Sequence, residues 1–163
     1  MPDRAINIPT EITSNSEEDT QLIGRTLSNS LRRGDIVALF GDLGSGKTRF
    51  VQGMCSGLSV QEPVVSPTFT IVNQYNGLNG DQKRLKIQHV DCYRLTTTDE
   101  LVDIGAEELL SSDDIIVVEW PRLVLPLIRG VYWEILIELG ELETQRIIKI
   151  DKKSTGANDD SRN

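Results

Sequence analysis

The residue types and spacing between Gly41 and Thr48 are those of a phosphate-binding loop. The segment reads Gly41, Asp42, Leu43, Gly44, Ser45, Gly46, Lys47 and Thr48, which fits the pattern G-x-x-x-x-G-K-[ST]. In such a loop successive backbone N–H groups point inward, and the following helix adds the partial positive charge of its N-terminus. The segment therefore predicts a site for the phosphates of a nucleoside triphosphate.

The loop glycines and two polar side chains are expected to have separate tasks. Glycine lacks a Cβ, so the three glycines allow positive φ and a close approach of phosphate to the backbone. Lys47 is expected to reach the β- and γ-phosphates as a point charge, and the Thr48 hydroxyl to ligate Mg²⁺. The apolar run 36–40 directly before the loop favours this interpretation over an ordinary strand-turn-helix corner.

A triphosphate site also needs a carboxylate at a strand end, which holds Mg²⁺ directly or through water. Two acids follow apolar segments, Asp91 and Glu119. Glu119 comes after four apolar residues, as expected for an acid at the carboxyl edge of a parallel sheet. Asp91 closes the segment 89–91 and is a candidate for positioning the attacking water or supporting the metal. Which acid ligates Mg²⁺ directly stays open.

Four other residues could respond to the nucleotide or contact a partner. Thr68, in Ser-Pro-Thr-Phe, has the place of a γ-phosphate sensor, although a rigid turn before a strand explains it nearly as well. Tyr93 and Trp120 stand beside the two acids, where they frame a ligand or partner, or simply pack in the core. Arg94 completes this set. His89 has no readable catalytic partner and is interpreted as structural.

The elements that position these residues follow from periodicity and capping. A strand is predicted over 36–40 and a helix over 47–56, ended by Gly57. An earlier helix is predicted over 16–31, with Ser16 as N-cap and three acids in its first turn. Segments 70–75 and 85–90 predict a hairpin.

The second half of the chain adds a buried strand and two outer ones. Residues 115–118 predict a strand covered on both faces, and 99–110 a helix with Leu101, Val102, Ile104, Ala106 and Leu109 on its inner side. Strands over 132–138 and 145–150 are expected to add antiparallel edges. The fold class is α/β: residues 1–150 form one P-loop NTPase domain with a mixed, mostly parallel central sheet flanked by helices. Residues 151–163 form a polar tail, expected to be disordered.

Composition narrows the possible partners. The chain has 163 residues and a formal net charge of -8, which disfavours direct binding to nucleic acid. Eight carboxylates and no Lys or Arg lie between Asp99 and Glu119, which fits either a solvated face or a docking surface for a basic partner. No long apolar run or basic leader is present, so a cytoplasmic protein without membrane contact is expected. Cys55 and Cys92 are interpreted as packing residues.

In order and spacing the chain resembles the TsaE family at four motifs: Gly41 to Thr48, Ser66-Pro67-Thr68-Phe69, His89-Val90-Asp91-Cys92-Tyr93-Arg94-Leu95 and Glu119-Trp120-Pro121. Members of this family are the small P-loop ATPases of the bacterial machinery that makes threonylcarbamoyladenosine in tRNA. The resemblance covers nearly all of residues 10 to 150. It implies a compact α/β domain that binds ATP and Mg²⁺, hydrolyses ATP slowly alone, and works with TsaB and TsaD.

The resemblance also implies residue roles. Gly41 to Thr48 would bind the phosphates, Thr48 and Glu119 would hold Mg²⁺, and Asp91 would be needed with Lys47 for hydrolysis. Ser16 would lie near the nucleotide base. Three positions depart from the family pattern: Ser45 and Cys92, usually Ala and Leu, and Arg49, which adds a cation near the phosphates.

Other functions stay open beside an ATPase that remodels a tRNA-modifying complex. A small-molecule kinase shares the phosphate loop but usually carries an arginine-bearing lid, and none is obvious here. A guanine-nucleotide switch is less consistent with the sequence, because the Asn-Lys-x-Asp element that reads the base does not occur. A non-catalytic, ATP-gated binding module would use Tyr93, Arg94, Trp120 and the acidic segment 99–119 as its docking surface.

Overall fold

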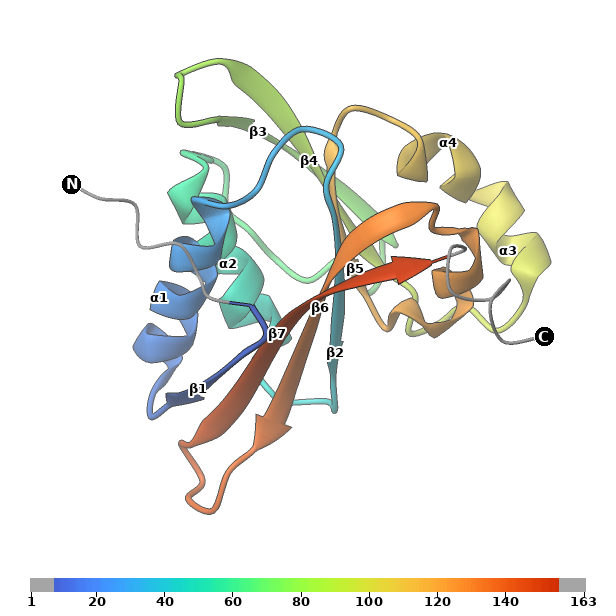
Figure 1. Cartoon of the computed structure of the whole chain (residues 1–163). Coiled ribbons are helices and arrows are strands. Elements are labelled where there is room, and N and C mark those ends of the chain that lie inside the picture. The colour runs from blue at the N-terminus through green and yellow to red at the C-terminus, as the bar shows by residue number, and fades with distance from the viewer. Residues whose placement is uncertain (1–7, 156–163) are drawn as a thin grey trace.

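A seven-stranded mixed sheet with helices on both faces forms the framework of residues 8–155, the part of the chain that the computed structural model describes (Figure 1). The strand order is β1-β7-β6-β2-β5-β4-β3. The strands are β1 (Thr10–Ser14), β2 (Ile36–Gly41), β3 (Val72–Leu78), β4 (Arg84–Asp91), β5 (Ile115–Glu119), β6 (Gly130–Leu139) and β7 (Arg146–Thr155). The predicted α/β class is confirmed.

The four central strands, β6, β2, β5 and β4, run parallel, and the outer pairings are antiparallel. The hairpin of β3 and β4 forms as predicted. In the parallel register Glu119 pairs with both Leu39 and Asp91, so the carboxyl ends of β2, β5 and β4 meet at one edge. The two acids singled out from the sequence therefore lie side by side at the ends of β4 and β5, level with Leu39 of β2.

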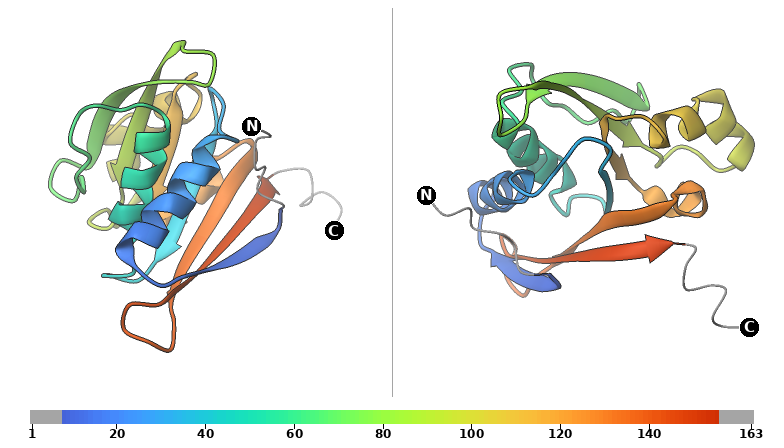
Figure 2. Two further views of the ribbon diagram at one scale, coloured as in Figure 1. Left: turned by 90° about the vertical axis from the view of Figure 1, so that its left-hand side faces the viewer. Right: turned by 45° about the horizontal axis from the view of Figure 1, so that its top comes forward.

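Helices of different length cover the two faces. The long helices α1 (Glu17–Ser28) and α2 (Lys47–Gly57) lie side by side on one face, and the short helices α3 (Thr98–Asp103) and α4 (Ala106–Leu110) lie at the other (Figures 1 and 2). Two 3₁₀ turns, η1 (Pro121–Leu123) and η2 (Leu125–Leu127), join the second face.

Strand β2 supplies apolar side chains to both layers, because successive side chains of a strand point to opposite faces. Val37 and Leu39 belong to the core under α1 and α2, whereas Ile36 and Ala38 belong to the core under α3, α4 and the 3₁₀ turns. This two-sided burial explains why the segment reads as a continuous apolar run rather than an alternating one.

Several predicted boundaries are wrong. The first helix ends at Ser28 instead of residue 31, and α2 includes Gly57, with Leu58 as its C-cap. The single helix predicted over 99–110 is two helices, because Gly105 takes the left-handed conformation (φ 71°) between them. Val102, expected on its inner side, is 73% exposed.

The outer part of the sheet also departs from the prediction. Strand β6 is not an edge, since it pairs in parallel with β2 as well as with β7. The edge belongs to β1, a strand that the sequence analysis missed. Strand β7 continues to Thr155, so residues 151–155 are not a disordered tail, and residues 156–163 lie outside the described part. Within residues 8–155 no helix has the length and apolar character needed to cross a bilayer.

Candidate functional site

The glycine-rich loop, residues 41–48, joins the end of β2 to the start of α2. Gly44 and Gly46 have φ values of 77° and 106°, in the region that favours glycine. A Cβ on Gly41 would lie 2.5 Å from Ser45 Oγ, so the loop closes too tightly there for a side chain. The local sequence thus dictates a tight turn that leads into the N-terminus of α2.

A cavity of about 320 Å³ lies against this loop and gathers most of the predicted site residues. Its lining comprises Glu17, Leu43, Gly44, Gly46, Lys47, Thr48, Arg49, Ser66, Thr68, Asp91, Tyr93, Glu119 and Trp120. We call it the loop cavity. Four segments that are remote in the sequence therefore converge on one space: the glycine-rich loop, the loop after α2, and the ends of β4 and β5.

Lys47 is bound to its own loop. Its Nζ donates hydrogen bonds to the carbonyl oxygens of Gly41 and Asp42, the latter at 2.9 Å, and lies 4.3 Å from the centre of the Trp120 ring. Burial lowers the pKa of Lys47, and the carboxylates of Glu119, Asp91 and Asp42 oppose that shift. The ammonium group thus has carbonyl and aromatic partners at the edge of the loop cavity.

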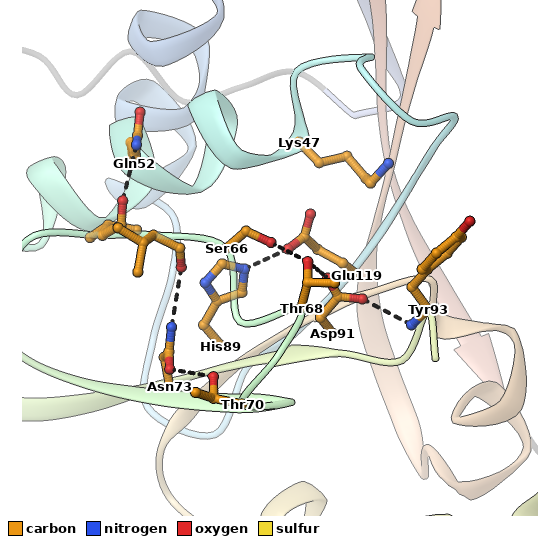
Figure 3. A network of polar contacts seen from close by, with 12 residues as sticks. Lys47, Gln52, Ser66, Thr68, Thr70, Asn73, His89, Asp91, Tyr93 and Glu119 are labelled. Atoms are coloured by element: carbon orange, nitrogen blue, oxygen red, sulfur yellow. Dashed lines mark hydrogen bonds and ion pairs between the residues drawn. The ribbon is translucent and has the colours of Figure 1, made fainter. Parts of the chain in front are cut away.

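The two acids at the sheet edge are buried and held by different partners (Figure 3). Asp91 Oδ1 accepts from the backbone N–H of Tyr93 at 2.9 Å, and Asp91 Oδ2 accepts from the Thr68 hydroxyl at 3.1 Å. Glu119 Oε2 lies 2.8 Å from His89 Nε2, which belongs to a fully buried ring. Each carboxylate is therefore oriented before any ligand is present.

The donor set of the loop cavity suits Mg²⁺. Thr48 supplies a hydroxyl, and Asp91 and Glu119 supply carboxylate oxygens, the ligands this hard cation prefers. In the described residues no group of three His, Cys, Asp or Glu side chains could hold a metal by itself. A Mg²⁺ ion here would therefore have to share protein oxygens with oxygens of a bound phosphate.

Thr68 is joined to the acid at the end of β4. The Thr68 hydroxyl donates its one proton to Asp91, so it must accept in its other hydrogen bond. The Ser66 hydroxyl, whose oxygen lies 2.7 Å from that of Thr68, is therefore the donor. Phe69 follows with 86% of its surface exposed, and the Arg94 guanidinium lies 5.5 Å from its ring centre. Arg94 does not line the loop cavity, whereas Tyr93 does and packs on Trp120 at 5.0 Å between ring centres.

The remaining predicted residues border other hollows. Ser16 lines a second hollow of about 430 Å³, together with Gly44, Ser45 and Gly46, and its side chain caps α1 by accepting from Asp19 N at 3.0 Å. Gly41 and Asp42 line a third hollow, which shares Tyr93 and Trp120 with the loop cavity. Ser16 thus borders the glycine-rich loop but does not reach the loop cavity.

Sequence reasoning missed two residues. His89 was interpreted as structural, yet it contacts Glu119; its spacing of two from Asp91, which puts both on one face of β4, was the available signal. Arg146 reaches the glycine-rich loop from β7, about a hundred residues away in the chain, and no local motif marks it.

Comparison with known proteins places these features in a family. A family model described as "Threonylcarbamoyl adenosine biosynthesis protein TsaE" matches residues 14–148. The protein named tRNA threonylcarbamoyladenosine biosynthesis protein TsaE from Treponema pallidum is 40% identical over 111 residues, 68% of this chain and 78% of that protein. Its namesake from Nostoc is 36% identical over 135 residues, 81% of this chain and 80% of that protein.

A solved structure agrees with the sequence relatives. The crystal structure of YdiB from Bacillus subtilis matches with a TM-score of 0.68 and 25% identity, covering 96% of this chain and 93% of that one. Both the sequence and the fold are therefore similar to those of known proteins. On the matched family model, the identities and the fold, the chain belongs to the TsaE family.

Proposed function

We propose that this protein binds ATP with Mg²⁺, hydrolyses it weakly, and acts on a TsaB/TsaD-type transferase complex during threonylcarbamoyladenosine modification of tRNA. One observation carries the nucleotide part: the glycine-rich loop, Thr48 and two oriented carboxylates surround a single cavity. Family membership supports the pathway, because the curated relatives carry threonylcarbamoyladenosine biosynthesis in their names.

In this proposal the loop binds the phosphates through its backbone N–H groups. The ammonium of Lys47 exchanges the carbonyl oxygens of Gly41 and Asp42 for phosphate oxygens, a change within reach of a flexible side chain. Thr48 and Glu119 would hold Mg²⁺, which supplies charge neutralisation at the β- and γ-phosphates when bound. The rest of the nucleotide extends along the loop toward Ser16 and the second hollow.

Asp91 is proposed as the acid that orients the attacking water. Its two oxygens accept from Tyr93 N and the Thr68 hydroxyl, so the carboxylate direction is set by the protein. The Thr68 contact also gives the loop at 66–69 a means to respond to the γ-phosphate. Trp120 and Tyr93 cover one side of the loop cavity, where they exclude water from the phosphates.

The net negative charge of this chain supports the proposal that its partners bind the tRNA. With a net charge of -8 this chain is poorly suited to hold the tRNA backbone, so the partner complex supplies the RNA contact. Tyr93, 48% exposed, lines the loop cavity, and the exposed Phe69 directly follows the lining residue Thr68, so a partner that contacts both could cover the nucleotide.

Calorimetry of ATP binding tests the nucleotide part. Lys47→Met is expected to weaken binding of ATP with Mg²⁺ by roughly 10- to 100-fold, because a charge-assisted contact is lost. Lys86→Met is the matched control: it removes the same charge from an exposed position on β4, away from the loop cavity. Equal affinity of Lys47→Met and wild type would contradict the proposal.

Reconstituted tRNA modification tests the pathway part. Asp91→Asn is expected to retain ATP binding within a few-fold but to lose repeated turnovers with the TsaB/TsaD-type partners. Unimpaired multiple turnover by Lys47→Ala would overturn the functional proposal. Transfer of γ-phosphate to a metabolite instead of water would favour the kinase alternative.

A non-catalytic, ATP-gated module remains the second candidate. It is favoured by the exposed Phe69 and Tyr93 beside the loop cavity, which form a surface that bound nucleotide could alter. Tight ATP-dependent association with the partners, without measurable hydrolysis even in their presence, would select it.

A further inference from the structure

The guanidinium of Arg146 forms four hydrogen bonds, all to backbone carbonyl oxygens. On one side Nε donates to Ser45 O at 2.9 Å and Nη2 donates to Gly44 O at 3.2 Å. On the other side Nη1 donates to Glu143 O at 2.7 Å and Gln145 O at 2.9 Å. One side chain thus links the outer surface of the glycine-rich loop to the turn between β6 and β7.

These contacts fall on the part of the loop that most needs support. When the N–H groups of a phosphate loop point toward the anion, neighbouring carbonyl groups point away from it. Gly44 has positive φ, and glycine loses more conformational freedom on ordering than any other residue. A planar guanidinium that bonds two consecutive carbonyl groups removes much of that freedom before a ligand arrives.

The base of Arg146 is rigid. Arg146 opens β7 and is paired with Ser14 of β1 and Leu139 of β6, so its backbone is held between two strands. The bonds to Glu143 and Gln145 fix the far edge of the guanidinium. The loop is therefore tied to the sheet on the side opposite β5 and β4, which carry the two acids.

The charge of Arg146 is also available to a phosphate. Among the described residues it forms no ion pair, whereas the nearby Arg49 pairs with Glu17 at 3.3 Å. A cation next to the loop makes the local potential more favourable for an anion, against the opposing charge of Glu17, Glu18 and Glu143, which line the same hollow.

We propose that Arg146 is a positioning residue for the nucleotide. Its bonds to the Gly44 and Ser45 carbonyl oxygens hold the glycine-rich loop with the N–H groups inward in the free protein. The inference rests on the proposed function and extends it, since it assigns part of the nucleotide affinity to a residue that binds two carbonyl oxygens of the loop and does not line the loop cavity.

Two variants separate the geometry of Arg146 from its charge. Arg146→Lys keeps the charge but cannot bond both loop carbonyls with a planar fork, and Arg146→Met removes both. By calorimetry we expect the Kd for ATP with Mg²⁺ to rise about 5- to 20-fold in Arg146→Lys and further in Arg146→Met. Lys149→Met, an exposed lysine on the same strand, should leave the Kd within two-fold of wild type.

Steady-state hydrolysis gives a second readout. In Arg146→Lys the KM for ATP should rise in parallel with the Kd while kcat stays within two-fold, because bound phosphates themselves order the loop. Global damage to the fold would instead lower kcat or the thermal unfolding midpoint. ATP affinity within two-fold of wild type for both variants would overturn the proposal.

Amide hydrogen exchange in the ligand-free protein tests, independently of ATP, whether Arg146 holds the glycine-rich loop in place. We expect the amides of residues 44–46 to exchange at least five-fold faster in Arg146→Lys than in wild type, with β2 and α2 unchanged. If wild type bound no ATP, the proposed function would fail, yet faster exchange in Arg146→Lys would still show that Arg146 holds the loop. Identical exchange at residues 44–46 in the two proteins would refute it.

Discussion

Two buried serines beside the glycine-rich loop differ in their hydrogen bonding. Ser45 Oγ is buried and has no partner among residues 8–155, whereas Ser14 Oγ donates to Ser16 O at 2.9 Å and lies 2.7 Å from Thr20 Oγ1. An unpaired buried hydroxyl costs stability, and a paired one does not. Ser45→Ala should therefore raise the free energy of unfolding by about 1 kcal/mol.

Urea denaturation measures the change in the free energy of unfolding. Ser14→Ala is the control for which a decrease is expected. That variant leaves Thr20 without one partner and should lose about 1–3 kcal/mol. A loss of stability in Ser45→Ala would show that its hydroxyl is satisfied in solution.

Both cysteines are expected to be unreactive in the folded protein. Burial raises the pKa of Cys55 and of Cys92 to about 12. At pH 8 only about one such thiol in ten thousand is ionised, so alkylation by iodoacetamide should be very slow until the protein is unfolded in urea. Unfolded thiols ionise near pH 9, so stability should fall as pH rises from about 9 toward 12. Rapid native-state labelling, read by mass spectrometry, would contradict this burial.

At the scale of elements, glycines set the distance between α1 and α2. A Cβ on Gly53 would lie 1.8 Å from Gln21 O, and one on Gly24 would lie 2.2 Å from Phe50 O. The two helix backbones are thus in contact. Because α2 begins with Lys47 and the glycine-rich loop precedes it, this contact also sets the position of the loop cavity.

Gly53→Ala should force the helices apart. An alanine normally stabilises a helix relative to glycine, but here overpacking against Gln21 should lower the free energy of unfolding by about 1–3 kcal/mol. Thermal and urea denaturation measure the loss, and Gly80→Ala, where an added Cβ meets nothing within 4 Å, is the control. A stabilised Gly53→Ala protein would show that the helices do not touch there.

For the whole molecule, ligand binding and unfolding are coupled. ATP with Mg²⁺ at about 100 times its Kd should stabilise the native state by about 2.7 kcal/mol, because the unfolded chain lacks the assembled cavity. For a domain of this size the unfolding midpoint should rise by about 5–11 °C. Scanning calorimetry measures the shift, and Lys47→Met at the same ATP concentration should show much less of it. Equal shifts in both proteins would argue for binding elsewhere.

Elements that depend on residues close together in the sequence were predictable, and elements that depend on distant residues were not. The strand-loop-helix unit and the strand ending in Glu119 were predictable, because their signals lie in adjacent residues. These signals are continuous apolar runs, which indicate burial on both faces, and the spacing of the glycines. The interrupted helix at Gly105 and the strand β1 were not. Their states depend on a left-handed turn and on pairing with β7, which lies more than 130 residues away in the chain.

The same distinction holds for the candidate site. The sequence alone determined the glycine-rich loop, Lys47, Thr48, and Asp91 and Glu119 as acids at strand ends, since each belongs to a local pattern with a direct chemical reason. Only the tertiary structure decided that His89 contacts Glu119, that Lys47 lies over Trp120, and that Arg146 supports the loop. These contacts arise from strand order and register, which bring distant residues together through the pairing of whole strands.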